Sequence, residues 1–135
     1  SASWLDSWQK STANQSPFDL AGTIFYPAKV RARAGAVWSS GNLTASAFAN
    51  YIDGVTDRTS GKRTSSFTTF DTTISYLVEG RDSPWSGLEL ALSGRNLLNR
   101  APPLYAPVAM TDVPYDSTNY SAIGRYVSIS LSKHW

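Results

Sequence analysis

The sequence ends in the stretch Gly124-Arg125-Tyr126-Val127-Ser128-Ile129-Ser130-Leu131-Ser132-Lys133-His134-Trp135, in which apolar and polar residues alternate. One parity holds Val127, Ile129, Leu131 and Trp135, and the other holds three serines and a histidine. Alternation with a period of two places successive side chains on opposite faces of a β-strand. The stretch therefore predicts a strand with one apolar face and one face rich in hydroxyl groups.

Four segments with the same alternation precede this strand. They lie at 30–38, 43–51, 70–76 and 88–95, and a partial sixth segment lies around Trp4–Gln9. Each of the full segments is about as long as a tilted membrane strand, roughly 9–11 residues. Phe48 is an exception, because it places an aromatic ring on the polar side of its segment. The pattern predicts an all-β chain folded as an antiparallel up-and-down meander of five to six strands.

The links between these segments alternate in length. The tight turn Ser39–Asn42 and the link Glu79–Gly87 are short, whereas the links Asp53–Thr68 and Asn99–Gly124 are long. Transmembrane β-barrels have short turns at one end of the strands and longer loops at the other. The alternation of link lengths therefore favours a barrel wall, although a soluble antiparallel sheet also produces alternating strands.

The composition excludes several classes of function. Hydrophobic residues make up 41% of the chain and charged residues 16%, which argues against disorder. The net charge of +2 comes without a run of Lys or Arg, so we expect no nucleic-acid partner. The chain has no cysteine and a single histidine, His134, so neither a catalytic triad nor a His/Cys metal site can be assembled. We expect no enzymatic activity, no metal site and no cofactor.

Several aromatic residues lie close to the ends of the expected strands. Trp38, Tyr76, Trp85 and Trp135 fall near short-turn ends, and Tyr51 and Phe70 fall near long-loop ends. Aromatic rings gather at the two membrane–water interfaces of outer-membrane barrels. We therefore expect membrane-interface aromatics at Trp38, Tyr51, Tyr76 and Trp85. The alternative is ordinary packing of aromatic rings at sheet edges and in a core.

Four short motifs together resemble one protein family. In chain order they are Asn50-Tyr51-Ile52-Asp53-Gly54-Val55-Thr56-Asp57, Phe70-Asp71-Thr72-Thr73-Ile74-Ser75-Tyr76, Ser93-Gly94-Arg95-Asn96-Leu97-Leu98-Asn99-Arg100, and the closing strand with its terminal aromatic residue. They are similar to the last strands of TonB-dependent outer-membrane receptors, and the resemblance runs from about Asp19 to Trp135. Leu98 departs from the family pattern, where Phe is common, and so does Lys133, where an apolar residue or Tyr is common.

The resemblance implies that residues 1–135 are the C-terminal segment of a 22-stranded transmembrane β-barrel, without the plug domain and the N-terminal barrel strands. It implies a place in the cell outer membrane and active uptake of a solute such as a ferric siderophore, another metal chelate or a saccharide. The implied partners are the remainder of the barrel and its plug, the TonB complex, outer-membrane lipid and the small-molecule solute. The barrel-assembly machinery is a further implied partner, and Trp135, Leu131 and Ile129 would form its C-terminal signal.

Four charged residues have the parity of the expected lumenal face, namely Arg31, Arg33, Asp71 and Arg95. If Val78 pairs with Leu88, Asp71 falls directly opposite Arg95, which predicts an ion pair there or one slipped by two residues. We expect its use to be structural, and the alternative is a role in ligand binding. Arg31 and Arg33 either attract an anionic solute or pair with carboxylates of the plug.

The resemblance places extracellular loops at 11–29, 54–69 and 100–124. Tyr105, Tyr115 and Tyr120 in the longest loop are candidates for ligand contact, because loops often carry recognition residues. The alternative is that these loops pack on one another.

Two other classes of protein remain open. A soluble β-sandwich binding module, for carbohydrate for example, would bury the leucines of 88–95 and the apolar face of the last strand in a core between two sheets. A small outer-membrane protein would instead close a barrel by oligomerising. The barrel-wall hypothesis leaves the same apolar residues as one outward band.

Overall fold

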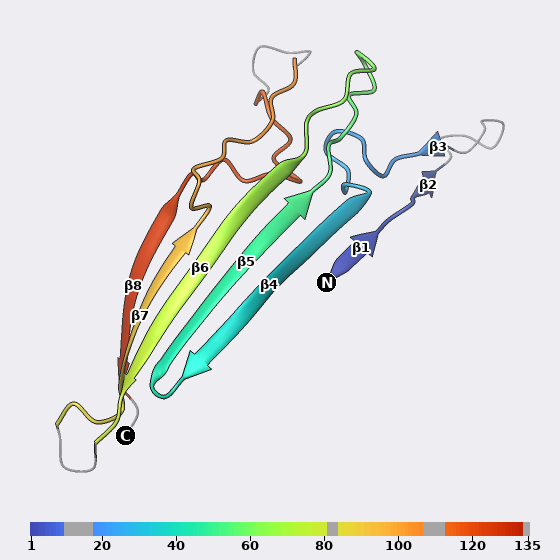
Figure 1. The fold of residues 1–135 in the computed structure, drawn as a ribbon. Helices are drawn as coiled ribbons and strands as arrows, with labels where there is room; N and C mark the ends of the chain where they lie inside the picture. The colour runs from blue at the N-terminus through green and yellow to red at the C-terminus, as the bar shows by residue number, and fades with distance from the viewer. Residues whose placement is uncertain (10–17, 81–83, 107–112, 134–135) are drawn as a thin grey trace. The chain divides into compact units, whose positions relative to one another are not determined.

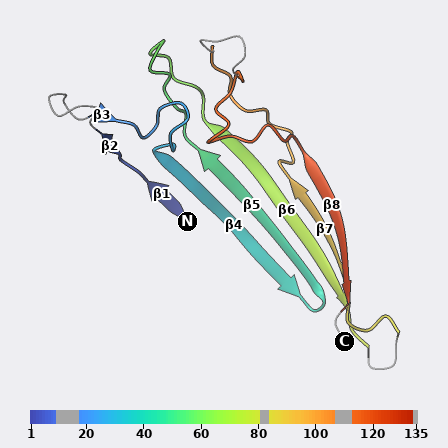
Figure 2. The ribbon, with the colours of Figure 1, turned by 180° about the vertical axis from the view of Figure 1, so that it is seen from behind.

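The computed structural model describes residues 1–9, 18–80, 84–106 and 113–133. Its elements are β1 (Ala2–Trp4), β2 (Trp8–Gln9), β3 (Phe18–Asp19), β4 (Val30–Ser40), β5 (Leu43–Ile52), β6 (Phe67–Val78), β7 (Leu88–Arg95) and β8 (Tyr126–Lys133). Six strands form one antiparallel sheet in the order β1-β4-β5-β6-β7-β8, and β2 pairs with β3 in a separate sheet (Figures 1 and 2). The predicted all-β meander of five to six strands is therefore confirmed.

The sixth strand of the sheet overlaps the partial segment expected around Trp4–Gln9 only at Trp4. It is β1, which pairs Trp4 with Val30 and ends there. Beyond it, the carboxylate of Asp19 accepts a hydrogen bond from the backbone N–H of Ser7, and Trp8 pairs with Asp19 in the separate sheet. The segment expected around Trp4–Gln9 therefore holds strand residues at both of its ends, but Trp8 and Gln9 pair with β3 and do not belong to the six-stranded sheet.

The two connections from β4 to β5 and from β6 to β7 lie at one end of the strands, at 41–42 and 79–87. The connections 53–66 and 96–125 lie at the other end (Figure 1). This separation follows from an antiparallel meander, in which successive links fall at alternate ends. The difference in length between the two sets is the one expected from the sequence.

The register between β6, β7 and β8 aligns side chains of one kind across the strands. Val78 pairs with Leu88, as the sequence analysis assumed. Apolar cross-strand rows are Ile74–Leu92–Ile129 and Tyr76–Leu90–Leu131, and polar rows are Thr73–Ser93–Ser128 and Ser75–Ala91–Ser130. Because side chains alternate between faces, these rows give the sheet one apolar face and one face of small polar residues.

Gly35 of β4 explains the aromatic ring at Phe48 of β5. A Cβ atom at Gly35 would lie 2.3 Å from Cδ1 of Phe48 and 2.4 Å from the carbonyl oxygen of Ala47. The ring of Phe48 thus occupies space over a residue without a side chain. This pairing fits the general role of aromatic neighbours in covering strand glycines.

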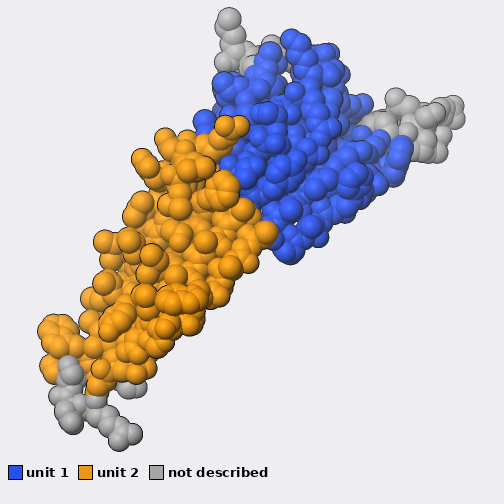
Figure 3. Space-filling model, viewed as in Figure 1, with its two compact units in different colours: residues 1–33, 50–68, 101–123 blue, residues 34–49, 69–100, 124–135 orange. Residues whose placement is uncertain are grey.

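The chain divides into two compact units, which Figure 3 shows in separate colours. Unit 1 comprises 1–33, 50–68 and 101–123, and unit 2 comprises 34–49, 69–100 and 124–135. Within unit 1, a small buried cluster consists of Ala28, Val55, Phe67 and Tyr120, with Ile24 and Ile52 packed against it. Unit 2 contains most of the length of the strands.

Candidate functional site

The apolar rows of unit 2 form an exposed surface, which we call the apolar band. Its members are Ile74, Tyr76, Leu90, Leu92, Ile129 and Leu131. Ile129 is 73% exposed, Leu131 66% and Leu92 46%. Large apolar side chains in contiguous exposed rows are unusual on a soluble monomer and mark a site of interaction with a protein partner, a ligand or a membrane.

Two of the three residues proposed as a C-terminal signal, Ile129 and Leu131, belong to the apolar band. Trp135 lies outside the described residues. The structure thus places the described part of this signal on the same face as the leucines of β7.

The opposite face of these strands carries hydroxyl groups. The hydroxyls of Thr73 and Ser93 lie 3.0 Å apart across β6 and β7, and Ser46 donates to the carbonyl of Thr73 at 3.5 Å. On this face Thr73, Ser75, Ser93 and Ser128 are half-buried, whereas Ser130 is exposed. On β6 and β7 the apolar band is thus the more exposed face, whereas a soluble sheet buries its apolar face.

The four expected interface aromatics are all exposed. Trp38 lies near the end of β4, Tyr76 lies near the same end of β6, and Trp85 lies in the connection 79–87. Tyr51 lies at the opposite end of β5, where its hydroxyl donates to the carboxylate of Asp53 at 3.4 Å. Their positions along the strands agree with the sequence, and their membrane role stays a prediction.

The predicted ion pair between Asp71 and Arg95 is not among the ion pairs that the described residues form. Instead, the carboxylate of Asp71 accepts a hydrogen bond from the backbone N–H of Asn96 at 3.0 Å. Strand β7 ends at Arg95, and Asn96 turns away with a φ of 49°. The turn brings the N–H of Asn96, rather than the guanidinium of Arg95, to the carboxylate.

Arg31 and Arg33 lie at alternate positions of β4 and therefore on one face. Arg31 donates from Nη2 to Oδ1 of Asn119 at 2.5 Å. Both arginines help to line a shallow pocket of about 280 Å³, together with residues of β1 and β5. Asn119 was not predicted as a partner, since it is far from Arg31 in the sequence.

Asn119 is the centre of a buried hydrogen-bond network in unit 1. Its Nδ2 donates to the carbonyl of Tyr26 and to the carboxylate of Asp116, each at 2.7 Å. Its Oδ1 accepts from the backbone N–H of Ala28 at 2.9 Å as well as from Arg31. The amide therefore uses both donors and accepts two bonds, so it joins the segment before β4 to the connection 96–125.

Asp116 closes the turn that holds Asn119 in place. The side chain of Asp116 is fully buried, and it accepts from the N–H groups of Phe25, Thr118 and Asn119. A short aspartate side chain that accepts from N–H groups two and three residues later forms an Asx turn.

Asp57 forms the same arrangement in the connection 53–66. It accepts from the N–H groups of Thr59 and Ser60 and from the hydroxyl of Ser60. The hydrogen bond from that hydroxyl is the largest contribution that holds the pKa of Asp57 below its ordinary value. The segments Asp57-Arg58-Thr59-Ser60 and Asp116-Ser117-Thr118-Asn119 share the pattern Asp-x-Thr-polar, and this pattern was the available sequence signal for both turns.

The three tyrosine candidates have different surroundings. Tyr120 is 3% exposed, packs edge-on against Phe67 at 5.6 Å between ring centroids, and donates to the carbonyl of Asp53. Tyr105 packs edge-on against Phe25 at 6.1 Å, and Tyr115 and Tyr120 both line an open pocket of about 480 Å³. The burial of Tyr120 favours the alternative that the loops pack on one another, and a ligand contact of the three tyrosines stays a prediction. Burial also raises the pKa of Tyr120.

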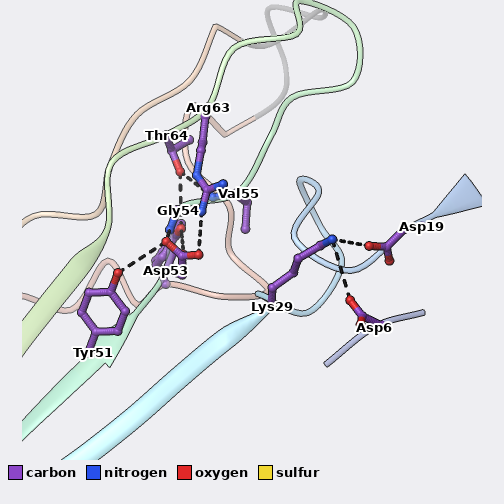
Figure 4. Close-up of polar contacts among 10 residues, drawn as sticks. Asp6, Asp19, Lys29, Tyr51, Asp53, Gly54, Val55, Arg63 and Thr64 are labelled. Carbon is purple, nitrogen blue, oxygen red and sulfur yellow. Dashed lines mark hydrogen bonds and ion pairs between the residues drawn. The ribbon is translucent and has the colours of Figure 1, made fainter. Parts of the chain in front are cut away.

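Two groups of charged residues lie in unit 1 (Figure 4). Arg63 pairs with Asp53 at 2.6 Å. Burial raises the pKa of Asp53, but Arg63 and the N–H of Gly54 lower it by more, so it lies below the ordinary value. Lys29 pairs with Asp19 and, at 3.8 Å, with Asp6.

The ion pair between Lys29 and Asp19 shifts the pKa of both residues. The hydrogen bond from Lys29 is the largest cause that lowers the pKa of Asp19, and the same bond raises the pKa of Lys29. These carboxylates are engaged by cations and N–H groups of the chain itself, and among the described residues no group of three or more His, Cys, Asp or Glu residues gathers to hold a metal ion.

Comparisons with protein-family models, with curated proteins and with solved structures found no match for this chain. Across the described ranges, the structure contains no helix that is long and apolar enough to cross a membrane.

Proposed function

We propose that this chain forms part of the wall of an outer-membrane β-barrel that serves active uptake of a solute, such as a ferric siderophore, another metal chelate or a saccharide. The observation that carries the proposal is the apolar band. Its six side chains align in cross-strand rows on one face of β6, β7 and β8, and each of them is between 45% and 73% exposed. In a barrel wall, this face meets lipid and the hydroxyl-rich face meets the lumen.

The edges of the sheet also support membership in a larger barrel. In the described part of the chain, β1 and β8 are the outer strands of the sheet, and each pairs on one side. Unpaired backbone N–H and C=O groups are too costly to leave in hydrocarbon, so membrane sheets close into barrels. Further strands would therefore have to join these edges. The resemblance of the four motifs to TonB-dependent receptors names the family in which we place the barrel.

A soluble β-sandwich would require the same residues to be buried. Its second sheet would cover Leu90, Leu92, Ile129 and Leu131, whereas these side chains range from 46% to 73% exposed. The exposed rows therefore favour the barrel wall over the sandwich, and the experiment below separates the two.

The test compares lysine substitutions at neighbouring positions on opposite faces of β8. Ile129→Lys places a charge in the apolar band, and Ser128→Lys places the same charge on the hydroxyl face. We expect the full chain to require detergent micelles for a monodisperse, strand-rich state. In micelles, Ile129→Lys should destabilise the chain by about 2–4 kcal/mol, while Ser128→Lys should change its stability much less.

Circular dichroism and size-exclusion chromatography with and without detergent measure these outcomes. A compact monomer in plain buffer would reject the barrel wall and favour the sandwich. Equal effects of the two lysines in micelles would show that the apolar band does not meet the detergent.

A further inference from the structure

The register between the strands β7 and β8 is not set by a tight hairpin turn. They are joined by the long connection 96–125. Because the entropy of closing a loop changes only slowly with its length, a connection of this length opposes a small shift in register only weakly. A tight hairpin turn, which normally fixes register, is therefore absent between them.

The alternating pattern does not fix this register completely either. A slip by one residue would turn every side chain of β8 to the other face, which the alternation opposes. A slip by two residues restores the faces, because it would pair Leu92 with Leu131 or Val127 in place of Ile129. All three partners are apolar. Such a slip would move β8 by about 7 Å along its neighbour.

We propose that Asp71, Asn96 and Asn99 act as a register clamp, a chain of side-chain hydrogen bonds that sets the alignment of β6, β7 and β8 at their long-loop end. Asp71 of β6 accepts from the N–H of Asn96, just beyond the end of β7, and the N–H of Leu97 donates to the carbonyl of Phe70 at 2.9 Å. These bonds fasten the turn after β7 to β6.

Asn96 shapes this turn. Its side chain donates to the carbonyl of Arg100 at 2.9 Å and accepts from the N–H of Arg100 at 2.8 Å. The backbone φ angles of Asn96 and Asn99 are 49° and 52°. Asparagine enters this left-handed region more readily than most residues, which accounts for its presence at both positions.

Asn99 carries the clamp to β8. Its Oδ1 accepts from the N–H of Arg125 at 2.9 Å, immediately before the first residue of the strand. A second observation is the close approach of Gly124, where a Cβ atom would lie 2.6 Å from the same Oδ1. Only glycine leaves room for this oxygen to reach Arg125. The bond therefore selects the alignment in which Arg95 pairs with Tyr126.

Disulfide cross-linking in the full chain reads this register directly, because the chain has no cysteine of its own. The pair Leu92→Cys and Ile129→Cys reports the observed register, and pairs of Leu92→Cys with Leu131→Cys or Val127→Cys report slips by two residues. Directly opposite residues meet the geometry of a disulfide, whereas diagonal neighbours lie too far apart.

Two substitutions of Asn99 distinguish the contribution of its side-chain oxygen from that of its positive φ angle. Asn99→Gly keeps the positive φ accessible but removes the acceptor, and Asn99→Asp keeps an acceptor. We expect Asn99→Gly to raise the ratio of slipped to observed cross-link about twofold to tenfold, since this is the range that one hydrogen bond contributes. Asn99→Asp should keep the ratio of the parent chain. Asn42→Ala, at the other end of the strands, serves as a control for loss of an asparagine.

The proposal is overturned if Asn99→Gly leaves the ratio unchanged, or if Asn99→Asp slips as much as Asn99→Gly. Gly124→Ala provides a second test. It should cause slipping by itself, and this single variant is the test if Asn99→Gly does not fold. If Asn99→Gly folds, adding Gly124→Ala to it should increase the slipping little, because the clash is with the side chain that is then missing. Gly124→Ala without any slip, or fully additive effects in the pair, would also reject the clamp. The inference does not depend on the membrane proposal, because the register can be read in buffer or in micelles.

Discussion

At the scale of single residues, a few short polar side chains organise the connections of unit 1. Asn119 and Asp116 are both buried, and their partners include Phe25, Tyr26 and Ala28. Buried polar atoms stabilise a fold only when their hydrogen-bonding capacity is used, and the described residues contain no buried side-chain nitrogen or oxygen without a partner. The network is therefore sensitive to the loss of one member.

We expect Asn119→Ala to lower the free energy of unfolding by about 1–3 kcal/mol, because it leaves the N–H of Ala28 and the carbonyl of Tyr26 without this partner. The control Ser117→Ala changes an exposed neighbour in the same turn and should stay within about 0.5 kcal/mol of the parent. Urea unfolding measures both. Equal stability of the two variants would mean that water replaces the amide without cost.

At the scale of elements, the sequence was sufficient to predict the long strands, whereas the pairing of Val78 with Leu88 entered only as an assumption that the structure bears out. The reason is physical, since a period of two specifies both the strand and its two faces. The partners of Asp116, Asn119 and Tyr120 were not predictable in this way. Their contacts join segments far apart in the chain, and no local pattern states which N–H group will meet a given carboxylate.

The failed prediction for Asp71 has the same origin. Its parity and position along β6 were right, but its partner depends on where β7 ends and the chain turns. Because Asn96 has a positive φ, the chain turns there, and the carboxylate of Asp71 accepts a hydrogen bond from the backbone N–H of Asn96 where an ion pair with Arg95 was expected. Strand ends are set by local turn chemistry, which the alternation of side chains does not encode.

The pairing of β4 with β5 depends on Gly35. We expect Gly35→Ala to destabilise the chain by about 1–3 kcal/mol, since the new methyl group would overlap both the ring of Phe48 and the carbonyl of Ala47. Phe48→Leu should relieve only part of this cost, because the carbonyl remains. Thermal unfolding measures the change, with Ala36→Ser on the same strand as the control. An unaffected melting temperature for Gly35→Ala would show that the strands separate easily at this point.

At the scale of the whole molecule, the two units are held together internally by different forces. The three recorded ion pairs, Lys29–Asp6, Lys29–Asp19 and Arg63–Asp53, all lie in unit 1. The described part of unit 2 consists mainly of strand ladders and the rows of side chains upon them. A change of pH should therefore act first on unit 1.

We expect acid to loosen unit 1 before unit 2. The pKa values of Asp19, Asp53 and Asp57 lie below the ordinary 3.8, so the stability that they contribute is present above pH 3.8 and is lost as the pH falls through their lowered values. At the alkaline end, the raised pKa of Lys29 gives stability that is complete below pH 10.5 and is lost as the pH rises through its folded value.

Hydrogen exchange measured across acid pH checks the acid limb. The amides of Ala28 and Val55 should lose protection at a higher pH than that of Leu92. Asp53→Asn keeps the shape of the side chain but removes its titration, so it should reduce the dependence on pH near Val55. Loss of protection in both units at one pH, or the same acid midpoint in Asp53→Asn, would contradict this account.

The turn at Asp57 is held by hydrogen bonds between residues that are close together in the sequence. Its side-chain bonds run only to Thr59 and Ser60, and the N–H of Gly61 returns to the carbonyl of Asp57 at 2.8 Å. The residues within it are exposed. Because its closure needs no distant partner, the exposed side chain of Thr59, whose backbone N–H makes the bond, can change without altering how the turn is held. The connection can thus vary in sequence at its exposed positions, or accept an inserted peptide tag, while the base of the loop stays as it is.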